Sequence, residues 1–335
     1  MTASAPAIRD WAVLVLLALA LSVCAYHLAA SLAFLHPDNA HTFVTAHLDD
    51  IRYDELRQEW KPRILSIGAA DVIAEYLWKQ GVRNAQVHLP LTIGIHSAFW
   101  LLLVNAALLW GFRRRAVFLM WGVFAAVVFG YCPGVVNRVY PWDLPALFFF
   151  AAFVACYHRR AYRALPVIVL AGLLFKETTA VLCLALFFLD IPMKRRLRYA
   201  LVTAALFVIV KVATDVAVGT PVPFFSMTVR PPDGGTSRLA ENVRILGRAT
   251  LAHPVFINAG TLVALAVVSA RNPAARMARW VAAAFAVNTL AFAVIDEYRI
   301  WLELAPLAAY VLAQRFHPGE YEQAATDSAP QPRTP

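Results

Sequence analysis

Charged side chains are scarce in this sequence: Asp, Glu, Lys and Arg make up only 15% of its 335 residues. A soluble domain usually carries about 25% charged residues, so a water-soluble globular architecture is excluded. The length would suffice for one or two soluble domains, but long apolar runs leave no room for them. Hydrophobic residues make up 60% of the chain, which indicates an integral membrane protein.

Paired-cysteine motifs and nucleic-acid-binding motifs are also lacking. The four cysteines show no CxxC spacing and mostly lie within apolar runs, which is typical of small buried hydrophobic residues: Cys24, Cys132, Cys156 and Cys183. The net charge of +9 comes from short basic clusters between apolar runs. Because membrane topology explains such clusters and no RNA or DNA motif accompanies them, we expect no nucleic-acid partner.

The N-terminal apolar stretch lacks a clear signal-peptide cleavage site. It covers residues 11–35 and is longer than the apolar region of a signal peptide. We therefore expect a retained first membrane span. No internal repeat is visible along the chain.

Apolar runs of membrane-helix length recur along the sequence, since a helix needs about 20 apolar residues to cross the hydrocarbon core. They predict an all-α fold: a polytopic membrane helix bundle with about ten segments. The predicted segments are 11–35, 90–112, 116–131, 142–157, 165–175, 179–192, 199–218, 254–270, 280–296 and 300–314.

Four short connections are strongly basic and predict the orientation. Together they hold 3 + 3 + 4 + 3 = 13 Lys or Arg and no acidic residue: Arg113–Arg115, Arg159–Arg163, Lys194–Arg198 and Arg271–Arg279. Lys and Arg are enriched in cytoplasmic loops, and an even number of segments separates successive clusters. We expect a multi-pass protein of the bacterial inner membrane, with both termini cytoplasmic.

The remaining connections are expected on the extracytoplasmic side: 36–89, 132–141, 219–253 and the turn near Asp296. In the first, Leu65, Ala69, Val72 and Tyr76 recur at helical spacing, which predicts an amphipathic helix over 64–78 lying flat on the outer leaflet.

The organisation of the chain follows from these assignments. Residues 219–253 are rich in Pro and Gly and predict a mobile loop. Residues 1–318 are predicted to form one membrane domain, followed by a disordered cytoplasmic tail over 319–335.

Two of the predicted segments are too short for full spans. About 30 residues separate Arg163 from Lys194, which is insufficient for two crossings at 1.5 Å per residue. The turn at 176–179 is therefore expected below the outer membrane surface, buried in protein or lining a wet cavity, unless the bilayer thins there. A single long tilted span is the alternative, although it would place two basic clusters on opposite sides.

Ionisable residues within or beside the apolar segments are the candidate functional residues, because such groups are expensive in a membrane. Asp49 and Asp50 follow the first span; they could bind a divalent cation, or one could serve as a general base. A solvated acidic loop is the alternative. Lys176 and Glu177 could bind a phosphate and a sugar hydroxyl, or form a structural ion pair.

Three further groups stand out. Arg138, near Asp143, could bind an anionic headgroup or extend to the lipid phosphates. The run from Asp296 and Glu297 to Arg299 continues to Glu303 one turn on. On a helix, Asp296, Arg299 and Glu303 share one face, which we expect to face a wet interior and not lipid. The last group is Lys211 and Asp215, four residues apart, for which an intrahelical ion pair is expected.

Taken together, these features resemble the GT-C class of membrane glycosyltransferases, over residues 1 to about 314. In that class an acidic pair lies in the first extracytoplasmic loop, where this chain has Asp49-Asp50. A Lys-Glu pair in a turn like FKETT and an Arg in a segment like DEYRIWLELAPL recur in bacterial membrane proteins of this type. Two departures are the adjacent aspartates, which are spaced apart in the class, and the missing soluble C-terminal domain of larger members.

The resemblance implies transfer of a sugar from a polyprenyl-phosphate donor to a hydroxyl of a glycan, lipid or protein acceptor, on the extracytoplasmic side of the cell envelope. It implies catalytic or metal-binding roles for Asp49 and Asp50, with Mg²⁺ or Mn²⁺ as the candidate cation. The implied substrate-binding residues are Lys176, Glu177, Arg138, Arg299, Glu297 and Glu303. The alternatives are a transporter or lipid flippase, and a non-catalytic membrane component of polysaccharide assembly.

Overall fold

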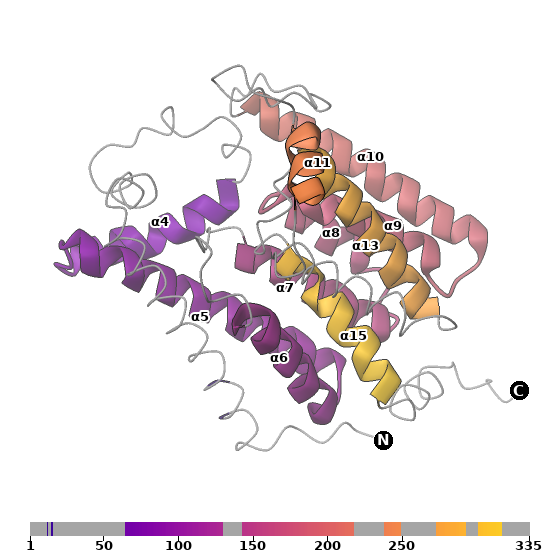
Figure 1. The fold of residues 1–335 in the computed structure, drawn as a ribbon, viewed down its shortest axis with the longest axis horizontal. Coiled ribbons are helices and arrows are strands. Elements are labelled where there is room, and N and C mark those ends of the chain that lie inside the picture. The colour runs from indigo at the N-terminus through magenta and orange to yellow at the C-terminus, as the bar shows by residue number, and fades with distance from the viewer. Residues whose placement is uncertain are drawn as a thin grey trace, which may run out of the picture.

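The computed structural model describes residues 64–129, 143–217, 238–248, 273–292 and 301–316, together with the single residues 12 and 15. All regular secondary structure in these ranges is helical (Figure 1), which confirms the all-α prediction for this part of the chain. The predicted segments 11–35 and 254–270 lie outside the described ranges, apart from the two single residues.

The helices follow the predicted apolar segments closely. Their bounds are α4 Ile64–Lys79, α5 Ala85–Gly111, α6 Arg114–Phe129, α7 Asp143–His158, α8 Leu165–Leu173, η3 Glu177–Val181, α9 Leu182–Ala185, η4 Leu186–Phe188, α10 Met193–Ala217, α11 Arg238–Arg248, α13 Pro273–Phe292, η5 Leu302–Leu304 and α15 Ala305–Phe316.

The main boundary error concerns two of the basic connections. Lys194–Arg198 forms the first turns of α10, and α13 already begins at Pro273, before Arg276 and Arg279. Lys and Arg are good helix formers, and their long side chains can carry the charge away from an apolar helix. A basic run therefore need not interrupt a helix.

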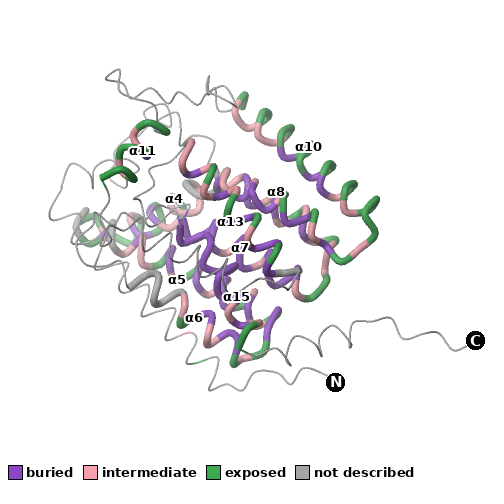
Figure 2. The backbone as a smooth tube through the Cα atoms, turned by 45° about the vertical axis from the view of Figure 1, so that its right-hand side comes forward, coloured by how far each residue is buried: buried purple, intermediate pink, exposed green. Residues whose placement is uncertain are grey.

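Two of the described helices, Leu91–Gly111 and Met193–Ala217, are long and apolar enough to cross a membrane. They differ in how they pack. Within the most apolar 18 residues of each helix, 44% is buried in the first helix but only 17% in the second. Figure 2 shows α10 along the margin of the bundle with exposed residues over much of its length. Its apolar surface is therefore largely uncovered by the described protein.

The centre of the bundle is α7, which is apolar on all sides, as expected of a fully buried helix. It contacts α5, α8 and α15. One close approach is at Gly111 of α5, where an added Cβ would lie only 2.6 Å from the Ala155 Cβ of α7. Glycine at this position lets the two backbones pack directly against each other.

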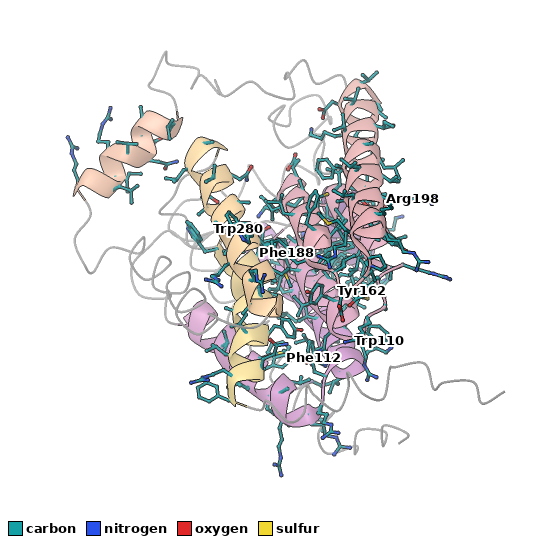
Figure 3. All side chains as sticks on the ribbon, turned by 90° about the vertical axis from the view of Figure 1, so that its right-hand side faces the viewer. Trp110, Phe112, Tyr162, Phe188, Arg198 and Trp280 are labelled. Carbon is teal, nitrogen blue, oxygen red and sulfur yellow. The ribbon has the colours of Figure 1, made fainter. Side chains whose placement is uncertain are left out.

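The C-terminal ends of α5, α7 and α15 lie together. Arg159 Nε donates to the Trp110 and Gly111 carbonyls, at 3.1 and 3.2 Å. The Phe112 ring packs 4.7 Å from the His158 ring and 5.6 Å from the Tyr310 ring, measured between centroids. We call this end, with its residues 110–115 and 158–163, the basic end; Figure 3 labels Trp110, Phe112 and Tyr162 there.

The segment between α7 and α10 leaves the basic end and returns to it. The chain runs outward through α8, turns at Lys176 and comes back through η3, α9 and η4. At the return, the Tyr157 hydroxyl donates to the Phe188 carbonyl at 2.9 Å, and Arg160 pairs with Asp190 at 3.2 Å. Two short helical arms are therefore present, as expected, and their predicted depth in a membrane stays a prediction. A single tilted span is contradicted, because both ends of the segment lie at the same end of the bundle.

The amphipathic helix predicted over 64–78 is present as α4. Leu65, Val72 and Tyr76 of the predicted apolar face are exposed, so this face is not used for packing within the described protein. The other side holds the buried Ala74, whose carbonyl accepts a hydrogen bond from His88 Nε2 of α5 at 2.8 Å. The helix is therefore attached to the bundle with the predicted apolar face outward.

The expectation of a mobile loop over 219–253 is wrong for part of that range, because residues 238–248 form α11. Leu239, Val243 and Leu246 recur on its exposed apolar face, while Asn242 is buried and donates to the Leu290 carbonyl of α13 at 2.9 Å. The Pro- and Gly-rich stretch before it obscured this short amphipathic pattern.

Candidate functional site

The candidate site is built on the break between α8 and η3. Lys176 is extended, with φ −160° and ψ 131°, between two helical segments. Its backbone groups remain bonded: its amide donates to the Gly172 carbonyl at 2.8 Å, and its carbonyl accepts from the Thr179 hydroxyl at 2.9 Å. The break therefore leaves neither group of Lys176 unsatisfied in the interior.

The Lys176 side chain joins three segments that are distant in the sequence. Its Nζ donates to Asp143 Oδ1 at 2.9 Å and forms an ion pair with Glu303 Oε1 at 2.5 Å. Lys176 is 4% exposed, Asp143 2% and Glu303 0%. We call Lys176, Asp143, Glu303 and Thr178 the buried cluster; the Thr178 hydroxyl donates to Glu303 Oε2.

Local structure explains where the two carboxylates sit. Asp143 is the first residue of α7, where the positive end of the helix dipole stabilises a negative charge. Glu303 lies in η5, immediately before α15. One ammonium faces two carboxylates, so the ionised cluster carries a formal charge of −1, and burying it is tolerable only because each charge has a close partner.

Aromatic side chains surround the turn that carries the cluster. The Phe175 ring lies 5.1 Å from the Trp100 ring and 5.2 Å from the Phe149 ring. Trp100 in turn donates from Nε1 to His96 Nε2 at 3.0 Å. Electrostatic attraction is stronger among apolar side chains than in water, so the charges of the cluster attract one another strongly where α7, the α8–η3 turn and η5 meet.

The sequence-based site residues fall into two groups. The structure brings Lys176 and Glu303 together, and Glu303 is buried in the protein interior, whereas the wet surroundings expected for it stay a prediction. Glu177 begins η3 directly after Lys176 and is half-buried. The other candidates lie outside the described residues, and their convergence on this site stays a prediction: Asp49, Asp50, Arg138, Glu297 and Arg299.

The partner of Lys176 was missed from the sequence. The motif VVNRVYPWDLP grouped Asp143 with Arg138, and the FKETT motif suggested Glu177 as the group that orients Lys176. The available signal was that Asp143, Lys176 and Glu303 are ionisable residues that each border an apolar segment. No sequence spacing relates the three, because their proximity depends on how the helices pack.

Two other sequence predictions can be compared with the structure. Lys211 and Asp215 of α10 form the expected ion pair within one helix. Among the described residues, no group of three or more His, Cys, Asp or Glu side chains could hold a metal ion. The Mg²⁺ or Mn²⁺ site considered for Asp49 and Asp50 falls outside that part of the chain.

The arrangement gives the buried cluster a definite position in the molecule. It lies where α7 begins and where η5 leads into α15, whereas both helices end at the basic end. The segments that carry Arg138 and Arg299 join the described structure beside Asp143 and Trp301.

No protein-family model, curated protein or solved structure matches this chain.

Proposed function

We propose that this chain is a multi-pass membrane glycosyltransferase of the bacterial inner membrane. It would move a sugar from a polyprenyl-phosphate donor to an acceptor hydroxyl of a glycan, lipid or protein on the extracytoplasmic side. Membrane placement is supported by α10, whose most apolar window is only 17% buried, since such a surface is costly in water. The positive-inside tendency supports a cytoplasmic basic end.

The observation that carries the proposal is the position of the buried cluster. With the basic end cytoplasmic, the cluster lies toward the outer part of the bundle, opposite the arginine-rich loops. Arg138 precedes Asp143 by five residues, and Arg299 precedes Glu303 by four. Both arginines therefore belong to segments that reach the bundle at the cluster, as a site for a lipid phosphate in the outer leaflet requires.

In the proposed reaction, Asp49 or Asp50 accepts the proton of the acceptor hydroxyl while its oxygen attacks the anomeric carbon of the sugar. The bond between that carbon and the donor phosphate breaks, and polyprenyl phosphate leaves with the electron pair. Arg138 and Arg299 neutralise the negative charge on the leaving phosphate. Glu177 and Glu297 would bind sugar hydroxyls.

Lys176 receives a different role from the one expected for it, because two carboxylates already hold its ammonium group. We assign it as a positioning residue, with Asp143 and Glu303. The cluster would hold the segments that carry Arg138 and Arg299 at a fixed separation, without touching the substrate itself.

The experiment measures release of polyprenyl phosphate from a panel of polyprenyl-phosphate sugars by the purified full-length protein. Loss of a general base typically lowers a rate by about 10²–10⁴-fold, so Asp49→Asn or Asp50→Asn should lose that much activity while still inserting into the membrane. Wild-type activity in both variants would remove the base assignment. A wild-type protein that turns over no donor would contradict the function.

A transporter is the second candidate, favoured by the broken α8–η3 pair with charged residues at the break, a feature of many transporters. The two candidates can be distinguished with Glu177→Cys in a cysteine-free background and an impermeant maleimide. An enzyme site predicts labelling from the outside and none from the inside. Labelling from either side, depending on substrate, would favour transport.

A non-catalytic assembly component is the third possibility. It is favoured by the mutual pairing of the cluster charges. Such a protein would tolerate neutralisation of Asp49 and Asp50.

A further inference from the structure

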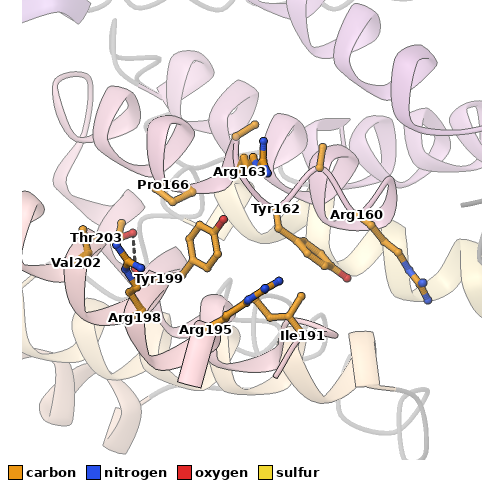
Figure 4. A pocket seen from close by; sticks show the side chains of 12 residues that line it. Arg160, Tyr162, Arg163, Pro166, Ile191, Arg195, Arg198, Tyr199, Val202 and Thr203 are labelled. Atoms are coloured by element: carbon orange, nitrogen blue, oxygen red, sulfur yellow. Dashed lines mark hydrogen bonds between the residues drawn. The ribbon is translucent and has the colours of Figure 1, made fainter. Parts of the chain in front are cut away.

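A second polar site lies at the basic end, far from the buried cluster. It is an open cavity of about 850 Å³ between the 160–164 turn, the start of α8 and the first turns of α10. Its polar lining comprises Thr203 and six larger side chains: Arg160, Tyr162, Arg163, Arg195, Arg198 and Tyr199 (Figure 4). The cavity therefore combines four arginines with two tyrosines on adjacent elements.

The positive charge of this cavity is mostly unbalanced. Arg160 pairs with Asp190 at 3.2 Å. The other three, Arg163, Arg195 and Arg198, are exposed, and no carboxylate in the described part of the chain forms an ion pair with any of them. An anionic group in the cavity would therefore gain attraction from several arginines without displacing an existing partner.

The walls of the cavity are apolar as well as basic. Its apolar lining consists of Ala161, Ala164, Pro166, Ile191 and Val202. From Val202 the exposed apolar surface continues along α10 through Leu206 and Ile209. A free anion would leave this surface uncovered, whereas a hydrocarbon chain would lie along it.

The tyrosine hydroxyls suit the boundary between a headgroup and an acyl chain, since aromatic residues with a polar tip are enriched at membrane interfaces. Burial raises the pKa of the Tyr162 hydroxyl. Tyr162 therefore stays protonated at neutral pH and can donate a hydrogen bond to a phosphate or glycerol oxygen. Its position between Arg160 and Arg163 places this donor among the charges.

We propose that this cavity binds the phosphate headgroup of an anionic phospholipid from the cytoplasmic leaflet, with an acyl chain along the exposed face of α10. Basic pockets between membrane helices on the cytoplasmic side are suited to such headgroups. The inference depends on the membrane placement proposed above and is independent of glycosyl transfer.

The test uses the full-length protein in a neutral detergent, titrated with phosphatidylglycerol and followed by native mass spectrometry. The variant Arg195→Gln/Arg198→Gln removes two cavity charges. The matched control Arg115→Gln/Arg315→Gln removes two exposed charges at the same end but outside the cavity. Each arginine near a lipid phosphate contributes about five-fold in affinity, so the variant should bind about 25-fold more weakly, and the control within about two-fold of wild type.

Two further measurements distinguish a bound lipid from a bound soluble anion. Phosphatidylcholine should bind far more weakly than phosphatidylglycerol, and a large excess of inorganic phosphate should not displace bound phosphatidylglycerol. Equal weakening of variant and control, displacement by inorganic phosphate, or equal binding of phosphatidylcholine would each overturn the proposal. Arg163→Gln, on the opposite wall, gives a second measurement with an expected loss of about five-fold.

Discussion

Lys176 shows how one side chain can connect distant parts of this fold. Its ammonium group lies within 2.9 Å of Asp143 Oδ1 and 2.5 Å of Glu303 Oε1, and all three residues are buried. A buried ion pair contributes little net stability compared with well-packed apolar residues, but removing one partner leaves an uncompensated charge. The cluster is therefore sensitive to single substitutions.

Lys176→Met is expected to leave two carboxylates buried together without their cation. Breaking a buried pair in this way costs about 3–5 kcal/mol, so the variant should unfold at a markedly lower denaturant concentration. Adding Glu303→Gln should recover part of the loss. Equilibrium unfolding of the purified proteins in detergent measures the effect.

Lys79→Met is the matched control for this prediction. It also breaks a Lys-carboxylate pair, with Glu75 at 2.6 Å, but both side chains are largely exposed. Surface pairs of this kind contribute about 0.3–0.5 kcal/mol, so the control should resemble the wild type. Equal stability of Lys176→Met and Lys79→Met would show that the buried cluster does not hold the bundle together.

Among the elements, the α8–η3 turn depends on close packing of its two arms. Gly172 is buried near the end of α8, and an added Cβ would lie 2.8 Å from Thr179 Cγ2 and 3.2 Å from the Phe149 ring. The Thr179 hydroxyl in turn bonds the Lys176 carbonyl. A side chain at Gly172 would therefore disturb the same turn that positions the Lys176 ammonium.

Gly172→Ala is expected to destabilise the protein by about 1–3 kcal/mol, the usual cost of overpacking. Gly122→Ala in α6 is the control, because an added Cβ there meets no atom within 4 Å among the described residues packed around this helix and alanine is the better helix former by up to about 1 kcal/mol. Thermal unfolding should therefore shift in opposite directions for the two variants. A stabilised Gly172→Ala protein would show that the turn has room for a methyl group.

The positions of most individual helices were predictable from the sequence. Apolar length alone predicted α7 over 142–157, against Asp143–His158 in the structure. The start of α10 was placed too late because the basic residues from Lys194 were interpreted as a connection. Helix α11 was missed because its pattern spans only 11 residues after a Pro- and Gly-rich stretch.

At the scale of the whole molecule, the two ends of the bundle differ in chemistry. Arg159 bonds the end of α5 and Arg160 bonds the end of the returning segment, so the basic loops gather at one end. The buried cluster lies where α7 and η5 begin, at the other end of α7 and α15. This polarity is the physical basis for the proposed orientation.

The orientation predicts which residues are reached by a membrane-impermeant maleimide in intact cells. In a cysteine-free background, Glu75→Cys in α4 should be labelled from outside, whereas Arg115→Cys should be labelled only after the membrane is permeabilised. Both positions are exposed on the described surface, so access to the reagent depends on the side of the membrane. The reverse pattern would invert the orientation and place the buried cluster toward the cytoplasm.

Local chemistry in the sequence was sufficient to predict the helical class, most helix positions and the short returning pair, because apolar length and basic loops act through nearby residues. It was also sufficient for the Lys211–Asp215 pair, whose partners lie one helical turn apart. Packing alone decided that Lys176 meets Asp143 and Glu303, and that four arginines line one cavity with Tyr162 and Tyr199. These contacts join residues far apart in the chain, so no local pattern specifies them.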